Sequence, residues 1–169
     1  MTALRFNHVG IGVADVDAAV EWYARVFGLE LVLGPFDVRA DTGPSGQQAQ
    51  DVLGPSFRHM RMAHMATGDG VGIELFQLLD PPHERREQPL EFWKSGTFHL
   101  CLTAEDLEGV TRRVIENGGR QRSRVWPNRP PDPARRMVYL EDPWGTIIEL
   151  YSHDYRTMYG QGGFPISPG

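Results

Sequence analysis

Two histidines and two glutamates in this sequence form a set that suits a divalent metal ion. They are His8, Glu74, His99 and Glu149. Imidazole nitrogens and carboxylate oxygens are common ligands of first-row divalent metals. Glu74, His99 and Glu149 each stand between two apolar residues in a strand-like run, so alternation turns their side chains away from the apolar face. For His8 the apolar neighbour is on one side only. All four are therefore candidate metal ligands.

The spacing of these residues reveals an internal repeat. An offset of 91 residues matches positions in the two halves of the sequence: His8 with His99, Asp15 with Asp106, and Gly28 with Gly119. An offset of 75 residues matches residues 73–76 with residues 148–151. Four accidental placements at equivalent points are improbable, so the repeat favours a metal site over four unrelated polar residues.

The elements that position these residues follow a β-α-β-β-β order in each half. The strands expected in the first half are residues 6–13, 29–38, 58–65 and 71–78, and those in the second are 97–103, 121–126, 135–140 and 146–151. The first helix has Asp15 or Asp17 as its N-cap and ends at Gly28, and the second spans residues 106–117. The helix aromatics Trp22 and Tyr23 are expected in the core.

These elements predict an α+β protein that forms one domain overall from two tandem modules. Residues 1–80 form the first βαβββ module, 81–95 a Pro-containing charged linker, 96–152 the second module, and 153–169 a Gly-rich tail that is extended or mobile. Residues 40–56 are rich in turn formers and are expected to be a long loop with room for one helical turn. A Pro-rich loop is expected at residues 127–133.

Composition narrows the class of protein. A formal net charge of −5 with interspersed acids and arginines provides no basic stripe, so nucleic acid is not an expected partner. No apolar run reaches the length of a membrane span, and no N-terminal leader pattern is present. The single cysteine, Cys101, excludes an internal disulfide and fits a reducing compartment. We therefore expect a cytoplasmic protein that acts on a small molecule.

Four stretches of the sequence resemble a known family. HVGIGVADVDAAVEWY, FHLCLTAEDL, ENGG and DPWGTIIELY are similar to segments of the vicinal oxygen chelate (VOC) superfamily. This superfamily contains glyoxalase I, methylmalonyl-CoA epimerase, extradiol dioxygenases, fosfomycin resistance enzymes and bleomycin-binding proteins. The resemblance covers residues 6–151 and implies two βαβββ modules in a curled, partly closed mixed sheet around a metal-containing cavity, usually in a homodimer.

The resemblance also implies roles for the four ligands. Their order, His8, Glu74, His99 and Glu149, matches that of glyoxalase I. The ion would be Ni, Co, Zn, Mn or Fe and would act as a Lewis acid on a small carbonyl or hydroxyketone, stabilising an enediolate or enolate. Glu149 would carry the proton, with Glu74 as its counterpart on the other side. The leading expectation is thus a lyase or isomerase of the glyoxalase I or epimerase type.

Substrate contacts are less constrained by the sequence. The candidate substrate residues are Arg58, Trp126, Tyr139 and Tyr151. No cationic set matches the glutathione grip of glyoxalase I, and Arg39, Arg58, Arg61 and Arg135 are candidates by location only. His59 and His64 fall on opposite faces of one strand, and surface placement is expected for both. Cys101 is expected to be a small buried residue.

Two alternatives remain open. An Fe(II) extradiol-type dioxygenase would use only His8, His99 and Glu149 as ligands. A drug-binding protein of the bleomycin resistance type would use the same fold without chemistry, although such relatives generally lack the metal set. One fold hosts many chemistries, so the resemblance alone does not decide between them.

Overall fold

The computed structural model describes residues 4–86, 91–129 and 132–160. These residues divide into two compact units, Met1–Arg85 and Arg86–Gly169. No helix in the described part of the chain has the length and apolar character needed to cross a membrane.

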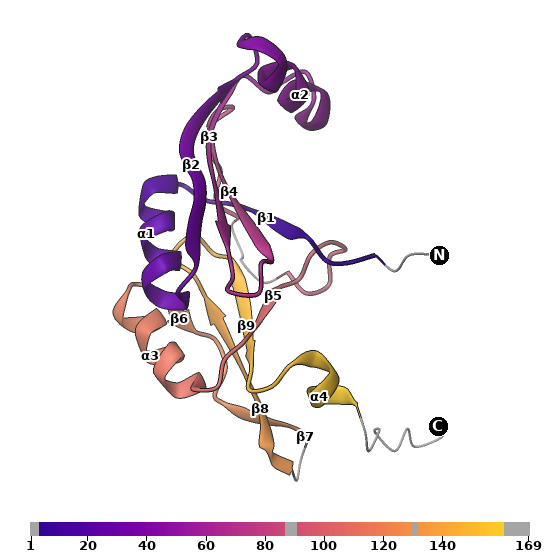
Figure 1. The fold of residues 1–169 in the computed structure, drawn as a ribbon. Coiled ribbons are helices and arrows are strands. Elements are labelled where there is room, and N and C mark those ends of the chain that lie inside the picture. The colour runs from indigo at the N-terminus through magenta and orange to yellow at the C-terminus, as the bar shows by residue number, and fades with distance from the viewer. Residues whose placement is uncertain (1–3, 87–90, 130–131, 161–169) are drawn as a thin grey trace. The chain divides into compact units, whose positions relative to one another are not determined.

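The first unit is a four-stranded sheet with two helices (Figure 1). Its elements are β1 (His8–Gly12), α1 (Val16–Phe27), β2 (Glu30–Arg39), α2 (Gly43–Leu53), β3 (His59–Ala66) and β4 (Gly72–Asp80). The strands lie in the order β1-β4-β3-β2. β1 runs parallel to β4, whereas β3 is antiparallel to both of its neighbours. Strands β1 and β4 therefore lie side by side although they come from opposite ends of the unit's sequence.

The second unit repeats this topology with different additions. Its elements are β5 (Leu100–Thr103), α3 (Leu107–Glu116), β6 (Arg120–Gln121), β7 (Trp126–Arg129), β8 (Asp132–Glu141), β9 (Ile147–Tyr151) and α4 (Tyr155–Tyr159). The order is β5-β9-β8-β6, and β7 also pairs with β8. β5 runs parallel to β9 as β1 does to β4. The predicted α+β class with two mixed sheets is confirmed. Over the described residues both sheets are open, and the curled arrangement around a cavity stays a prediction.

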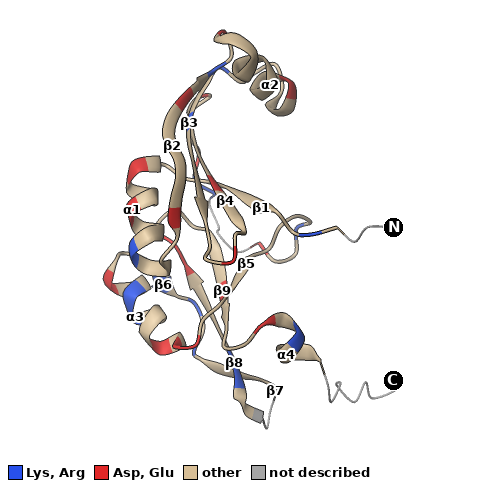
Figure 2. Cartoon of the chain, in the orientation of Figure 1, with Lys and Arg blue, Asp and Glu red and all other residues tan. Residues whose placement is uncertain are grey.

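Each of the two long helices begins at an aspartate cap. The Asp15 side chain accepts hydrogen bonds from the backbone N–H groups of Asp17 and Ala18, and Asp106 accepts one from Gly109. Gly28 ends α1 in the left-handed conformation, with φ of 71°, which glycine adopts without a steric penalty. Charged residues of both signs occur on both helices (Figure 2). The caps therefore lie where the sequence predicted them.

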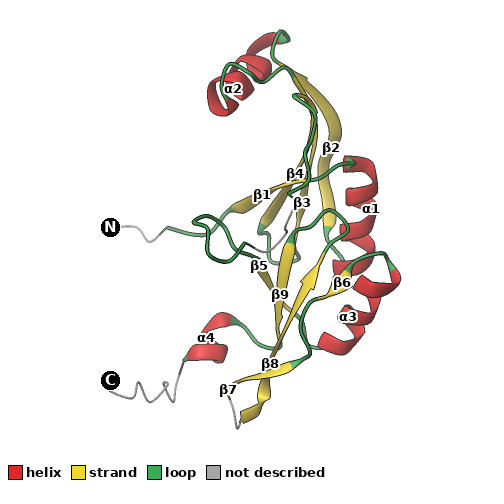
Figure 3. Cartoon of the chain, turned by 180° about the vertical axis from the view of Figure 1, so that it is seen from behind, coloured by secondary structure: helices red, strands yellow, loops and turns green. Residues whose placement is uncertain are grey.

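Each helix packs its apolar stripe on one face of its own sheet (Figure 3). In the first unit Tyr23 is fully buried and Trp22 is 6% exposed, as expected from the sequence. Leu75 on β4 and Leu150 on β9 occupy equivalent positions of the repeat, and both are buried. Since neighbours along a strand point to opposite faces, burying these leucines turns Glu74 and Glu149 to the face opposite the helix.

The prediction of a loop at residues 40–56 is wrong, because most of it forms α2. The segment has weak helical periodicity, and glycines and a proline mask it. Tertiary contacts stabilise it instead: Gly46 and Ala49 are buried, and a Cβ at Gly46 would lie 1.9 Å from the Arg39 carbonyl oxygen. Only glycine permits this approach of helix to strand.

Other boundaries also differ from the predictions. Residues 121–126 do not form one strand, because Ser123 interrupts the ladder: Arg122 and Ser123 both donate to the Tyr139 carbonyl, and the Ser123 hydroxyl accepts from Tyr139 N–H. β7 occupies part of the predicted loop 127–133, of which 130–131 lie outside the described residues. The same holds for 87–90 of the linker and 161–169 of the tail.

Two further corrections concern the ends of the second unit. β5 begins only at Leu100, because its partner β9 begins at Ile147, so His99 directly precedes the strand. The tail is not extended at its start, since α4 forms there. Asp154 caps this helix by accepting from the N–H groups of Arg156 and Thr157.

An ion pair between Arg61 on β3 and Asp17 on α1 predicts a small pH dependence of stability. The hydrogen bond from Arg61, with its charge, lowers the pKa of Asp17 below its usual 3.8. Asp17→Asn is therefore expected to lower the free energy of unfolding at pH 7 by about 0.2–1 kcal/mol. Because a depressed acid pKa stabilises only above that range, the difference should vanish as the pH falls through the lowered pKa. Urea unfolding at pH 7 and pH 3, with exposed Asp51→Asn as control, measures it; a difference unchanged at pH 3 would contradict it.

Candidate functional site

In the first unit, Glu74 lies in a cross-strand row between Gly10 on β1 and His64 on β3. Its carboxylate faces two imidazoles. Glu74 Oε2 is 3.5 Å from His8 Nε2, and Oε1 is 3.3 Å from His64 Nδ1. Thus two of the predicted ligands, His8 and Glu74, come together within this unit, and a second histidine joins them.

Aromatic and apolar side chains border this row. The Phe36 ring stacks on His64 with centroids 5.9 Å apart and planes at 18°. A Cβ at Gly10 would lie 2.9 Å from the Phe76 ring, so the absence of a side chain at Gly10 leaves that ring its place beside Glu74. Farther along the sheet an apolar cluster packs against α2; its members are Val38, Ala49, Phe57, Met60 and Met62, with Phe36, Ala40, Phe76 and Leu78 against it.

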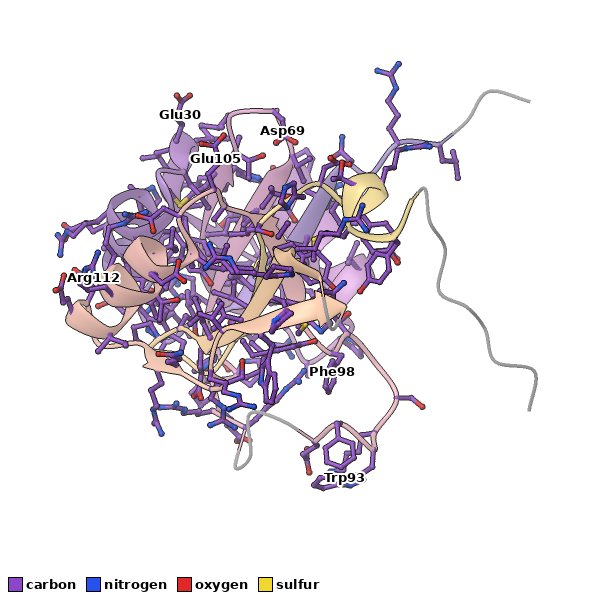
Figure 4. The ribbon with its side chains drawn as sticks, turned by 90° about the horizontal axis from the view of Figure 1, so that it is seen from below. Glu30, Asp69, Trp93, Phe98, Glu105 and Arg112 are labelled. Atoms are coloured by element: carbon purple, nitrogen blue, oxygen red, sulfur yellow. The ribbon has the colours of Figure 1, made fainter. Side chains whose placement is uncertain are left out.

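In the second unit, Glu149 lies in the equivalent row between Cys101 on β5 and Tyr139 on β8. Glu149 is 2% exposed, and its Oε2 is 3.1 Å from His99 Nε2. The edge of the His99 ring meets Tyr139, with centroids 5.4 Å apart. Phe98, half exposed on the segment before β5, packs on the other side of His99 (Figure 4). The second pair of predicted ligands therefore also comes together within its own unit.

The groups beside Glu149 remain protonated at neutral pH. Burial of the thiol, followed by the charge and hydrogen bond of Glu149, raises the pKa of Cys101 to about 12. The same causes raise the pKa of the Tyr139 hydroxyl above its usual value. Cys101 as a residue is exposed, contrary to the expectation of a buried one, because it lies on the edge strand β5. Both groups can therefore donate hydrogen bonds to Glu149.

The donor set fits a divalent cation. Glu149 is a buried carboxylate, and within the described residues its ionic partner is His99 rather than any arginine or lysine. A buried carboxylate without a firm positive partner is costly, and a metal ion would supply that charge. His99 Nδ1 is also buried and lacks a hydrogen-bond partner in the described part of the chain. No three His, Cys, Asp or Glu side chains among the described residues are already arranged as a metal group.

The structure places the predicted substrate residues in different surroundings. Tyr139 lies in the Glu149 row, and the Tyr151 hydroxyl is 2.7 Å from that of Tyr159 on α4. Trp126 is 43% exposed, with the Arg124 guanidinium 3.4 Å from its ring centroid. Arg58 Nη1 donates to the carbonyls of Pro55 and Phe57 and precedes β3. Six strand residues separate it from His64, or about 20 Å.

The two histidines of β3 do lie on opposite faces. His59 Nε2 is 2.6 Å from Asp37 Oδ1, on the face that carries α1. His64 faces Glu74, so the expectation of mere surface placement missed a residue of the site. The turn at residues 67–70 contained the signal: a hairpin closed there pairs His64 with Glu74. The offset of 75 residues, which also relates His64 to Tyr139, was a second signal.

Comparison with known proteins identifies the family. The profile of the Glyoxalase/Bleomycin resistance protein/Dioxygenase superfamily matches residues 5–150. A 2-epi-5-epi-valiolone epimerase from Actinomyces sp. is 26% identical over 153 residues, which cover 88% of this chain and 79% of the relative.

Solved structures agree with this match. A glyoxalase family protein from Bacillus cereus has a TM-score of 0.72 and 26% identity, covering 89% of this chain and 95% of its own. The fosfomycin resistance protein FosX from Listeria monocytogenes, complexed with Mn(II) and 1S,2S-dihydroxypropylphosphonic acid, shares the fold with a TM-score of 0.57 at 12% identity, over 94% and 96% of the two chains. Since the profile spans most of the sequence, the chain belongs to the Glyoxalase/Bleomycin resistance protein/Dioxygenase superfamily.

Proposed function

We propose that this protein is a divalent-metal-dependent isomerase of the epimerase type that acts on a small hydroxyketone. The observation that carries the proposal is the buried Glu149 carboxylate, which faces His99 at 3.1 Å and pairs with no arginine or lysine among the described residues. A carboxylate in this position suits both a cation and a proton transfer. The Actinomyces relative, named as an epimerase, supports this reaction class.

The proposed ligands are His8, Glu74, His99 and Glu149. That the two pairs bind one ion rests on the sequence repeat and on the family, since each pair is described within its own unit. FosX with Mn(II) supports a divalent ion for this fold. When bound, the ion would supply Lewis acidity at the carbonyl of the substrate. The curled sheet around a cavity and the homodimer belong to this same proposal.

The chain's own residues would move the proton. Glu149 Oε2 accepts a proton from the carbon next to the carbonyl, and Glu74 is its counterpart, which returns a proton on the opposite face of that carbon. The phenol of Tyr139 and the thiol of Cys101 stay protonated and donate to Glu149. Burial of Glu149 restricts water at the carboxylate, which protects the transfer from exchange with bulk solvent.

Mn(II) titration calorimetry on the purified protein tests the ligand set. Wild type is expected to bind one Mn(II) per chain. Glu74→Gln and Glu149→Gln should each lower the affinity by about tenfold or more, because each removes a charged ligand and metal sites lose this much even from changes around the ligands. The matched control is Glu108→Gln, an exposed carboxylate on α3 whose partner is Arg136.

The same titration separates the alternatives. If only Glu149→Gln weakens binding, the Fe(II) dioxygenase with His8, His99 and Glu149 becomes the better assignment. If wild type binds no divalent ion, the enzyme proposal fails and a drug-binding protein is favoured. Loss of affinity in Glu108→Gln would indicate a general effect of charge rather than loss of a ligand.

A further inference from the structure

The two candidate ligand glutamates have equivalent neighbours on the adjoining strand. His64 pairs with Glu74 across β3 and β4, and Tyr139 pairs with Glu149 across β8 and β9. Both residues of each pair are related by the same offset of 75 residues. His64 and Tyr139 are therefore one structural position that occurs in both units, although the residue types differ.

Each of these side chains meets the carboxylate beside it. His64 Nδ1 is 3.3 Å from Glu74 Oε1, and the Tyr139 hydroxyl hydrogen-bonds with Glu149. The ring of His64 lies flat on Phe36, at an interplanar angle of 18°, which restricts its rotation. Because His8 Nε2 faces the other oxygen, Oε2, the two oxygens of Glu74 are divided between two imidazoles.

We infer that His64 and Tyr139 are positioning residues that orient the ligand carboxylates of Glu74 and Glu149. This inference rests on the proposed function and names residues that act through the ligands rather than on the substrate. A donor fixed on one carboxylate oxygen holds the other oxygen in a single direction. Groups that hold metal ligands in this way strongly affect affinity, since a ligand free to rotate must be ordered when the ion binds.

The inference is tested with Co(II) as the probe, by titration calorimetry and by the visible absorption spectrum of the bound ion. His64→Phe keeps a ring on Phe36 but removes the nitrogen, and it should lower Co(II) affinity by about 10–100-fold. His64→Asn restores a nitrogen donor near the position of Nδ1 and should recover most of that loss. Tyr139→Phe should weaken binding in the same direction and alter the spectrum.

The matched control is His59→Phe, a histidine of the same strand that faces the opposite side and bonds Asp37. It should bind Co(II) as wild type does. The inference is overturned if His64→Phe stays within about twofold of wild type, a change far below the loss expected at a metal site. It is also overturned if His64→Asn is as weak as His64→Phe, since packing of the ring would then explain the loss.

A measurement without metal separates this inference from the proposed function. If wild type does not bind Co(II), the metal proposal fails, and the contact is then judged by a double-mutant cycle of unfolding free energies with His64→Phe and Glu74→Gln. Non-additive effects would support orientation of Glu74 by His64. Additive effects would overturn it.

Discussion

Replacing Glu149 with glutamine is expected to slow proton exchange at the carbon beside the substrate carbonyl by about 10²–10⁴-fold, the usual contribution of a positioned acid or base. The amide introduced by Glu149→Gln keeps the size of the side chain but cannot accept that proton. The rate is measured by ¹H NMR in D₂O, as solvent deuterium enters a panel of small hydroxyketones at saturating Mn(II). Saturation matters because the same change removes a charged ligand.

Glu108→Gln provides the control for this experiment. Glu108 is a carboxylate of the same unit, but it lies on the surface of α3 and pairs with Arg136. Its replacement should leave the exchange rate unchanged. An exchange rate in Glu149→Gln close to that of wild type, with Mn(II) still bound, would remove Glu149 as the proton carrier and transfer that role to Glu74.

The second large effect concerns stability. Leu150→Ala is expected to lower the free energy of unfolding by about 2–5 kcal/mol, the range for a buried leucine replaced by alanine. Leu150 is 1% exposed and lies on β9 between Glu149 and Tyr151. Its loss opens a cavity between the sheet and α3, and Glu149 shares its strand. Urea or thermal unfolding measures the change.

The repeat supplies a comparison for this prediction. Leu75 is at the equivalent position of β4 and is fully buried, so Leu75→Ala should cost a similar amount. Val32→Ala, at a side chain 65% exposed on β2, should change stability by less than about 0.5 kcal/mol. If Leu150→Ala behaves like Val32→Ala, the packing described for the second sheet is wrong.

Local rules were sufficient for the parts of the fold that depend on short-range physics. Asp15, Asp106 and Gly28 act at helix ends through hydrogen bonds and a backbone conformation confined to neighbouring residues. Alternation along a strand is equally local, and it placed Glu74 and Glu149 opposite the apolar layer. The elements that failed depend on distant residues: α2 is stabilised by its approach to the Arg39 backbone, and residues 121–126 are interrupted by the Ser123 contacts with Tyr139.

The sequence by itself determined the α+β class, the two-fold repeat, the family resemblance and the four candidate ligands. These follow from residue types at fixed spacings, which a linear chain already contains. The tertiary structure decided which side chains accompany the ligands: His64 beside Glu74, and Cys101 and Tyr139 beside Glu149. Strand register sets these partners, and register depends on the turns and on the packing of whole strands rather than on any single residue.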